Sequence, residues 1–220
     1  MKKRIKAVIF DMDGVIVDSE PLNDQHMQIH FQRIGIKFTV DYVEQFRGTN
    51  SKTVWTKVKQ DFNLTESLDE LITKSRASYI DFLKNKKDIV PVSGVKELLQ
   101  RLGHNHFKTA VTSSASPKRI DLLLDVCRIK NLFDIIVSTD DVVHGKPAPD
   151  VYLKTAERLK IPPNQCVVIE DAENGVKAAK SAGMKVIGFA GLPYNKQNLS
   201  HADKIIFSFD EMSSSLIQAL

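Results

Sequence analysis

The chain has 220 residues, of which 42% are hydrophobic and 26% charged, and its formal net charge at pH 7 is +4. This composition is that of a globular protein with a buried core, and it excludes a disordered or fibrous chain. The excess of positive charge is too small and too scattered to indicate a nucleic-acid-binding protein. We therefore expect a small anionic molecule as the partner and no nucleic acid.

The sequence also gives no indication of a membrane-spanning segment or of a secretion signal. No apolar segment approaches the ~20 residues that span a bilayer, and residues 1–10 lack the apolar stretch and cleavage site of a signal peptide. Cys127 and Cys166 lie in apolar surroundings, as buried thiols in a reducing compartment do. We expect a cytoplasmic protein with no membrane partner. Since no large exposed apolar patch is apparent, we expect a monomer or a weak dimer.

Strand and helix patterns alternate through most of the chain. Short apolar runs rich in β-branched residues, without two-residue alternation, predict strands covered on both faces. These runs are residues 7–10, 109–112, 135–137, 167–169 and 186–189. Helical spacing of apolar residues predicts helices at 93–102, 117–126 and 173–182, and another after an N-cap at Asp150. The alternation predicts an α/β fold with a doubly wound parallel, Rossmann-like core sheet.

One stretch interrupts this alternation. Between residues 17 and 88 we find no convincing strand, and helical patterns cover much of it, near residues 22–34, 40–46, 53–62 and 68–83. We expect a helical cap at residues 17–88, inserted into an α/β core made of residues 1–16 and 89–220.

Polar side chains follow four of the predicted strands. In strand order they are Asp11 and Asp13, then Ser113 and Ser114, then Lys146 a short loop after the third strand, then Glu170 and Asp171. In open parallel sheets, ligands bind beyond the carboxyl ends of the strands. We therefore expect these side chains to share one site. Asp141 and Asp150 are expected to order the loop that carries Lys146.

The composition of this site indicates a divalent cation and a phosphorylated ligand. Massed carboxylates repel one another unless a cation lies among them, and oxygen ligands without histidine or cysteine favour Mg²⁺ over zinc. Mg²⁺ keeps several waters and binds readily to a phosphate. Lys146 offers a positive charge to a phosphoryl group, and Ser113 offers a hydrogen-bond donor.

Four segments, in order, resemble the motifs of the haloacid dehalogenase-like hydrolases. They are residues 11–20 (DMDGVIVDSE), Ser113, residues 145–150 (GKPAPD), and residues 169–172 (IEDA) with Gly175. The resemblance spans nearly the whole chain and is greatest to the β-phosphoglucomutase-like phosphatase branch. It implies a phosphatase for a small phosphate monoester, such as a sugar or polyol phosphate.

The resemblance also implies a role for each residue at the strand ends. Asp11 would attack phosphorus and form an aspartyl-phosphate. Asp13 would protonate the leaving alcohol and then activate water. Ser113 and Lys146 would bind the phosphoryl oxygens, and Ser114 would contact the substrate. The implied Mg²⁺ ligands are the carboxylates of Asp11, Glu170 and Asp171 and the main-chain carbonyl of Asp13.

The helical cap is expected to close over the substrate and to contact it. The implied contacts are Asn23, Gly48 and Lys52, although a simple capped turn would explain residues 48–52 equally well. β-Phosphoglucomutases usually carry a histidine where this chain has Asn23. They also tend to carry an arginine that grips a second phosphate, where this chain has Ser51 or Lys52, and this favours a phosphatase.

Alternatives to a phosphatase stay open. A β-phosphoglucomutase-type sugar phosphomutase would use the same aspartyl-phosphate, and a non-catalytic phospholigand-binding module could share the scaffold. A dehalogenase is disfavoured, because such enzymes lack the second aspartate of the first motif. His26 and His30 are four residues apart and could bind a metal, but no acidic partner completes the set.

Overall fold

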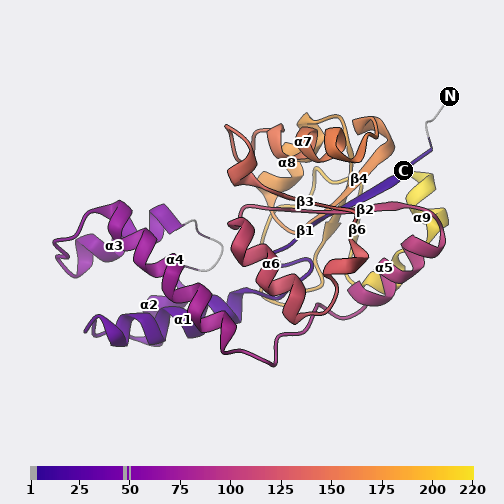
Figure 1. Ribbon diagram of the computed structural model, residues 1–220. Coiled ribbons are helices and arrows are strands. Elements are labelled where there is room, and N and C mark those ends of the chain that lie inside the picture. The colour runs from indigo at the N-terminus through magenta and orange to yellow at the C-terminus, as the bar shows by residue number, and fades with distance from the viewer. Residues whose placement is uncertain (1–3, 47–48, 50) are drawn as a thin grey trace. The chain divides into compact units, whose positions relative to one another are not determined.

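The computed structural model describes residues 4–46, 49 and 51–220, and the chain divides into two compact units (Figure 1). One unit, which we call the core unit, comprises Met1–Asp18 and Ile89–Leu220. The other, the helical unit, comprises Ser19–Asp88. Within the described residues we find no helix that combines the length and the apolar character needed to span a membrane.

A six-stranded, fully parallel sheet forms the centre of the core unit. Its strands are β1 Ala7–Asp11, β2 Lys108–Ser113, β3 Ile135–Ser138, β4 Cys166–Glu170, β5 Lys185–Phe189 and β6 Lys204–Ile206. The strand order is β3-β2-β1-β4-β5-β6. Every residue of β1 and β4 is buried, which explains why both strands are continuous apolar runs. The predicted α/β fold with a Rossmann-like sheet is confirmed.

Helices cover both faces of this sheet (Figure 1). The helices of the core unit are α5 Val95–His104, α6 Pro117–Val126, α7 Asp150–Leu159, α8 Glu173–Ser181 and α9 Ser214–Ala219. Short 3₁₀ turns lie at Lys130–Leu132, Thr139–Asp141, Pro163–Gln165 and Phe209–Glu211. Helices α7 and α8 pack on one face, where Tyr152 and Ala156 belong to a large apolar cluster with the strands. Cys127 and Cys166 are both buried and free, as predicted.

The structure differs from the sequence-based expectation at two places in the core unit. β6 and α9 were not expected, because each is short and has few buried residues. Asp150 is the first residue of α7 and not its N-cap, which is Pro149. The Asp150 carboxylate instead accepts hydrogen bonds from the His144 amide (3.3 Å) and ring (3.0 Å), and so spans the loop that contains Lys146.

The described residues of the helical unit form four helices. They are α1 Glu20–Arg33, α2 Val40–Glu44, α3 Ser51–Asp61 and α4 Leu68–Lys84. A capping box between Ser67 and Glu70 starts α4. The unit has its own apolar cluster, which includes Phe31, Trp55 and Val58. Such a cluster makes the helical unit a compact body in its own right.

His26 and His30 are buried among aromatic rings of the helical unit. Their own rings are stacked with centroids 5.4 Å apart. The rings of His30 and Trp55 are nearly perpendicular, with centroids 5.5 Å apart. Burial lowers the pKa of His30 below its ordinary value of 6.5, and the charge of Arg33 adds to the effect. This environment favours a packed, uncharged imidazole.

The helical unit is therefore expected to lose stability in mild acid. Because the pKa of His30 is lower in the folded state, the unfolded state binds protons more readily, and the free energy of unfolding falls as the pH drops below about 6.5. Urea unfolding at pH 5 and pH 8, followed by the fluorescence of Trp55, the single tryptophan, measures this change. His30→Gln should reduce the difference between the two pH values. The same substitution at the exposed His104 should leave it unchanged.

Candidate active site

The sheet places the candidate residues where its strand order reverses. β2 and β3 extend the sheet on one side of β1, and β4 to β6 extend it on the other. Asp11 ends β1 and Glu170 ends β4, and the register pairs Phe10 with Ile169 immediately before them. Two carboxylates thus leave adjacent strands at the carboxyl edge, which is where open α/β sheets bind their ligands.

Lys146 lies between these two carboxylates. Its Nζ atom is 2.5 Å from Asp11 Oδ1 and 2.7 Å from Glu170 Oε1, and only 9% of the side chain is exposed. Burial alone would lower the pKa of Lys146, but Asp11 and Glu170 raise it well above its ordinary value. The lysine is therefore held as a cation. Tyr152 completes the arrangement by donating its hydroxyl to Glu170 Oε1 (2.9 Å).

Asp11, Glu170 and Asp171 form a possible acidic metal site. One carboxylate oxygen from each lies within 4.8 Å of the others, and no other such group occurs among the residues that the structure describes. Burial raises the pKa of Asp11 to about 8 even though Lys146 opposes the shift. Burial and the charges of Glu170 and Asp11 also raise the pKa of Asp171 well above its ordinary value. A bound cation would relieve this repulsion, and three oxygen donors suit a hard cation.

Gly14 makes room for the Asp171 carboxylate. Its φ angle is +80°, in the left-handed region, and a Cβ atom there would lie 2.0 Å from Asp171 Oδ2. A side chain at position 14 would therefore displace a proposed metal ligand.

Gly175 has the same relation to the Glu170 carboxylate. A Cβ atom at position 175, in α8, would lie 1.6 Å from Glu170 Oε1. Three groups hold the Glu170 carboxylate. Lys146 and Tyr152 donate to Oε1, and the Ala172 amide donates to Oε2 at 3.0 Å. The carboxylate has no room to retreat without losing these bonds.

Gly175→Ala should therefore destabilise the protein, against the usual trend in helices. We expect a loss of about 1–3 kcal/mol in the free energy of unfolding from overpacking beside a fixed carboxylate. Gly103→Ala is the matched control, because Gly103 lies in α5 with nothing within 4 Å of its Cβ position. It should instead gain up to about 1 kcal/mol. Urea titrations measure the free energy of unfolding of both variants. Equal changes in the two variants would contradict the prediction.

The Asp13 side chain is not part of the acidic cluster. Its Oδ1 atom accepts a hydrogen bond from Arg119 Nη2 at 2.6 Å, and 34% of the side chain is exposed. Residues 13–17 turn tightly, because the Gly14 amide bonds to the Val17 carbonyl at 2.8 Å. The carboxylate is therefore directed to a partner of its own, which separates its role from that of Asp11.

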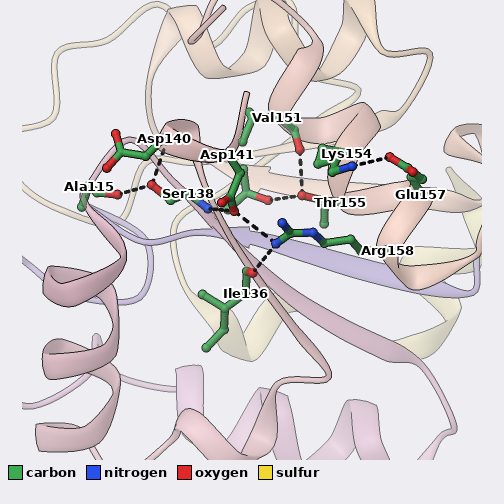
Figure 2. A network of polar contacts seen from close by, with 11 residues as sticks. Ala115, Ile136, Ser138, Asp140, Asp141, Val151, Lys154, Thr155, Glu157 and Arg158 are labelled. Atoms are coloured by element: carbon green, nitrogen blue, oxygen red, sulfur yellow. Dashed lines mark hydrogen bonds and ion pairs between the residues drawn. The ribbon is translucent and has the colours of Figure 1, made fainter. Parts of the chain in front are cut away.

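Ser113 ends β2 and is buried, whereas Ser114 is exposed. The Ser113 hydroxyl accepts the Ala115 amide at 3.0 Å. The Ala115 carbonyl in turn accepts the Ser138 hydroxyl at 2.7 Å (Figure 2). The loop after β2 is thus tied to the end of β3. This contact holds Ser113 and Ser114 at the carboxyl edge of the sheet.

A second part of this network orders the chain before Lys146. Asp141 Oδ2 accepts the Ser138 amide at 3.2 Å and Arg158 Nη1 at 3.1 Å, and Arg158 also donates to the Ile136 carbonyl (Figure 2). Helix α7 is thereby fastened to β3. The expected structural role of Asp141 agrees with these contacts.

A family model described as haloacid dehalogenase-like hydrolase matches residues 8–189. The chain belongs to this family. Its membership confirms the resemblance found in the motifs. It also accounts for the order in which the strands deliver the acidic residues, the serine and the lysine to one edge.

Relatives of this haloacid dehalogenase-like hydrolase include phosphatases and a phosphomutase. The phosphorylated carbohydrates phosphatase of Thermotoga maritima is 30% identical over 83% of this chain and 84% of its own. Protein SUPPRESSOR OF QUENCHING 1, chloroplastic, of Arabidopsis thaliana is 35% identical over 84% of this chain, but this spans only 18% of the plant protein. The crystal structure of β-phosphoglucomutase from Clostridium difficile has a TM-score of 0.76 and 25% identity, covering 98% of this chain and 96% of that one. The predicted branch and the predicted enzyme class, a phosphoric monoester hydrolase, are confirmed.

Three predicted substrate contacts of the hydrolase belong to the inserted segment. Asn23 lies in α1 and Lys52 in α3 of the helical unit, while Gly48 lies outside the described residues. These three contacts stay predictions. The metal role considered for His26 and His30 finds no support, because both rings pack against aromatic side chains.

Sequence reasoning missed two contact residues of this site. Tyr152 falls within the helix that the sequence predicts after Asp150, and its hydroxyl bond to Glu170 follows only from the need of a buried tyrosine for a partner. Arg119 was not singled out at all. Its position in the first turn of α6, where a cation is unfavourable, is the signal that could have found it.

Proposed function

We propose that this hydrolase is a Mg²⁺-dependent phosphatase that acts on a sugar or polyol phosphate through an aspartyl-phosphate on Asp11. The proposal rests on one observation. Carboxylate oxygens of Asp11, Glu170 and Asp171 lie within 4.8 Å of one another, and the Lys146 ammonium forms ion pairs with Asp11 and Glu170. A buried cation beside a cluster of carboxylates suits the binding of a phosphoryl group together with a metal ion.

Asp11 is the proposed nucleophile. It ends the central strand β1 and is buried at the carboxyl edge of the sheet, where the Lys146 ammonium holds its Oδ1 atom. A carboxylate oxygen fixed in this way can attack phosphorus with little loss of freedom. The product is an acyl phosphate on Asp11, which water then hydrolyses.

Asp13 is the proposed acid and base. Its side chain is more exposed than that of Asp11 and stays outside the acidic cluster. It can therefore give a proton to the departing alcohol and take one from the attacking water, while Asp11 carries the phosphoryl group. This division gives the two aspartates of the first motif different tasks.

Mg²⁺ fits the donors that the structure provides. The carboxylates of Asp11, Glu170 and Asp171 would hold it, with the main-chain carbonyl of Asp13 as the proposed further ligand. When bound, the ion supplies positive charge that stabilises the phosphoryl oxygens. Lys146 adds a second positive charge, and Ser113 with Ser114 offers hydroxyl groups at the end of β2.

The substrate class is proposed from the relatives. The Thermotoga maritima enzyme is named for phosphorylated carbohydrates, and it aligns with most of this chain. The structural likeness to a β-phosphoglucomutase supports a sugar phosphomutase as the second candidate. We also propose a reducing location such as the cytoplasm, because Cys127 and Cys166 are both free.

A panel of phosphorylated metabolites tests the proposal. The protein is incubated with sugar and polyol phosphates and with β-glucose 1-phosphate, and both inorganic phosphate and isomerised sugar are measured. We expect phosphate release that requires Mg²⁺ and stops with EDTA. Isomer formation that exceeds phosphate release would establish the phosphomutase. Binding without either product would establish a non-catalytic module and contradict the proposal.

A further inference from the structure

Arg119 and Asp13 form an ion pair between two distant parts of the core unit. Arg119 Nη2 lies 2.6 Å from Asp13 Oδ1, although the residues are 106 positions apart in the sequence. Only 21% of the arginine side chain and 34% of the aspartate side chain are exposed. The contact joins the first turn of α6 to the turn that follows β1.

The position of Arg119 is a poor one for the helix itself. Helix α6 begins at Pro117, and its first turn contains no acidic residue but two cations, Lys118 and Arg119. The amino end of a helix carries partial positive charge, so a cation there is unfavourable. The charge of the arginine therefore opposes the dipole of α6. The ion pair with Asp13 offsets this cost.

We propose that Arg119 is the positioning residue of Asp13, and that its guanidinium fixes the direction in which Asp13 exchanges a proton. The inference rests on the acid and base role proposed above for Asp13. Arg119 engages Oδ1, and we assign proton transfer to the other oxygen, Oδ2. A charge-assisted hydrogen bond of this length restricts the rotation of the carboxylate.

The assigned oxygen then serves both steps of the reaction. In the first, an Asp11 oxygen forms a bond to phosphorus, the bond from phosphorus to the leaving oxygen breaks, and the proton of Asp13 Oδ2 goes to that oxygen. In the second, a water oxygen forms a bond to phosphorus, the bond to Asp11 breaks, and the proton of the water goes to Asp13 Oδ2. Protons and phosphoryl groups balance over the cycle, and Arg119 itself transfers none.

Leaving groups of different basicity separate this role from a merely structural one. A sugar alkoxide needs a proton as it departs, whereas p-nitrophenolate leaves without one. In Arg119→Ala we expect kcat/KM for the best sugar phosphate to fall about 10- to 100-fold, because the acid is no longer aligned. For p-nitrophenyl phosphate, kcat/KM should change by less than about 3-fold, because its leaving group needs no acid. Its kcat and KM should both fall, since the second step still needs Asp13.

Three further variants complete the experiment. Arg119→Lys keeps one charged donor and should recover part of the lost kcat/KM for the sugar phosphate. Lys118→Ala removes the exposed neighbouring charge of the same helix turn and should leave both substrates unaffected. Asp13→Asn should also lower kcat/KM more for the sugar phosphate than for p-nitrophenyl phosphate, and the difference should be larger than in Arg119→Ala. Urea unfolding of every variant verifies that it is folded.

The results distinguish a failure of the positioning role of Arg119 from a failure of the acid role of Asp13. If Arg119→Ala and Arg119→Lys lower kcat/KM equally for both substrates, or for neither, the positioning role is wrong while the function of Asp13 stands. If Asp13→Asn itself fails to discriminate between the substrates, the acid role of Asp13 is wrong, and the role of Arg119 falls with it.

Discussion

Asp11→Asn is expected to lower kcat for every substrate by at least about 10³-fold, since the amide cannot attack phosphorus. The substitution keeps the shape of a side chain that is buried at the end of β1. It removes one negative charge from the acidic cluster, so the variant should fold at least as stably as the parent. Phosphate release under saturating Mg²⁺ measures the loss.

The control for Asp11→Asn is the same change at a surface position. Asp121 lies on α6 and pairs with Lys130 at 3.0 Å, with about half of its side chain exposed. Asp121→Asn should retain full kcat. If Asp11→Asn retained more than about a tenth of the parental kcat, the assignment of the nucleophile would be wrong.

Gly14→Ala is expected to weaken Mg²⁺ binding by about 10- to 100-fold, the range seen when the support of a metal ligand is lost. The added Cβ atom would lie 2.0 Å from Asp171 Oδ2, so the carboxylate must move away from Asp11 and Glu170. The positive φ angle adds backbone strain of about 1–2 kcal/mol. Calorimetric titration with Mg²⁺ measures the affinity, and urea unfolding measures the strain.

Gly183→Ala separates the two effects. Gly183 also has a positive φ angle, +75°, but nothing lies within 4 Å of its Cβ position. This variant should lose a similar amount of stability to backbone strain and keep its affinity for Mg²⁺. Equal Mg²⁺ affinities in the two variants would show that Gly14 does not protect the position of Asp171.

The sheet was predictable because its central strands are covered on both faces. Continuous apolar runs identified β1 and β4, whose residues are all buried. β6 escaped prediction because it is a three-residue edge strand with one buried residue. A short edge strand acquires its structure from its neighbour β5, and its own sequence carries little signal.

The candidate site was predictable to the extent that strand ends define it. Asp11 and Glu170 end neighbouring strands, so their proximity follows from the topology once the strands are known. The unfavourable position of Arg119 in the first turn of α6 marks the residue in the sequence. Its contact with Asp13, however, depends on how that turn packs in the fold. The steric need for Gly14 likewise depends on a carboxylate more than 150 positions away.

Identification of the phosphorylated residue tests the account most directly. The enzyme is quenched in acid during turnover of its best substrate, and the acyl phosphate is reduced with borohydride, which converts the modified aspartate to homoserine. Peptide mass spectrometry should then find homoserine at position 11 only, and only in samples that contained Mg²⁺. Homoserine at position 13, or turnover with an unmodified Asp11 in every quenched sample and under every quench time, would contradict the account.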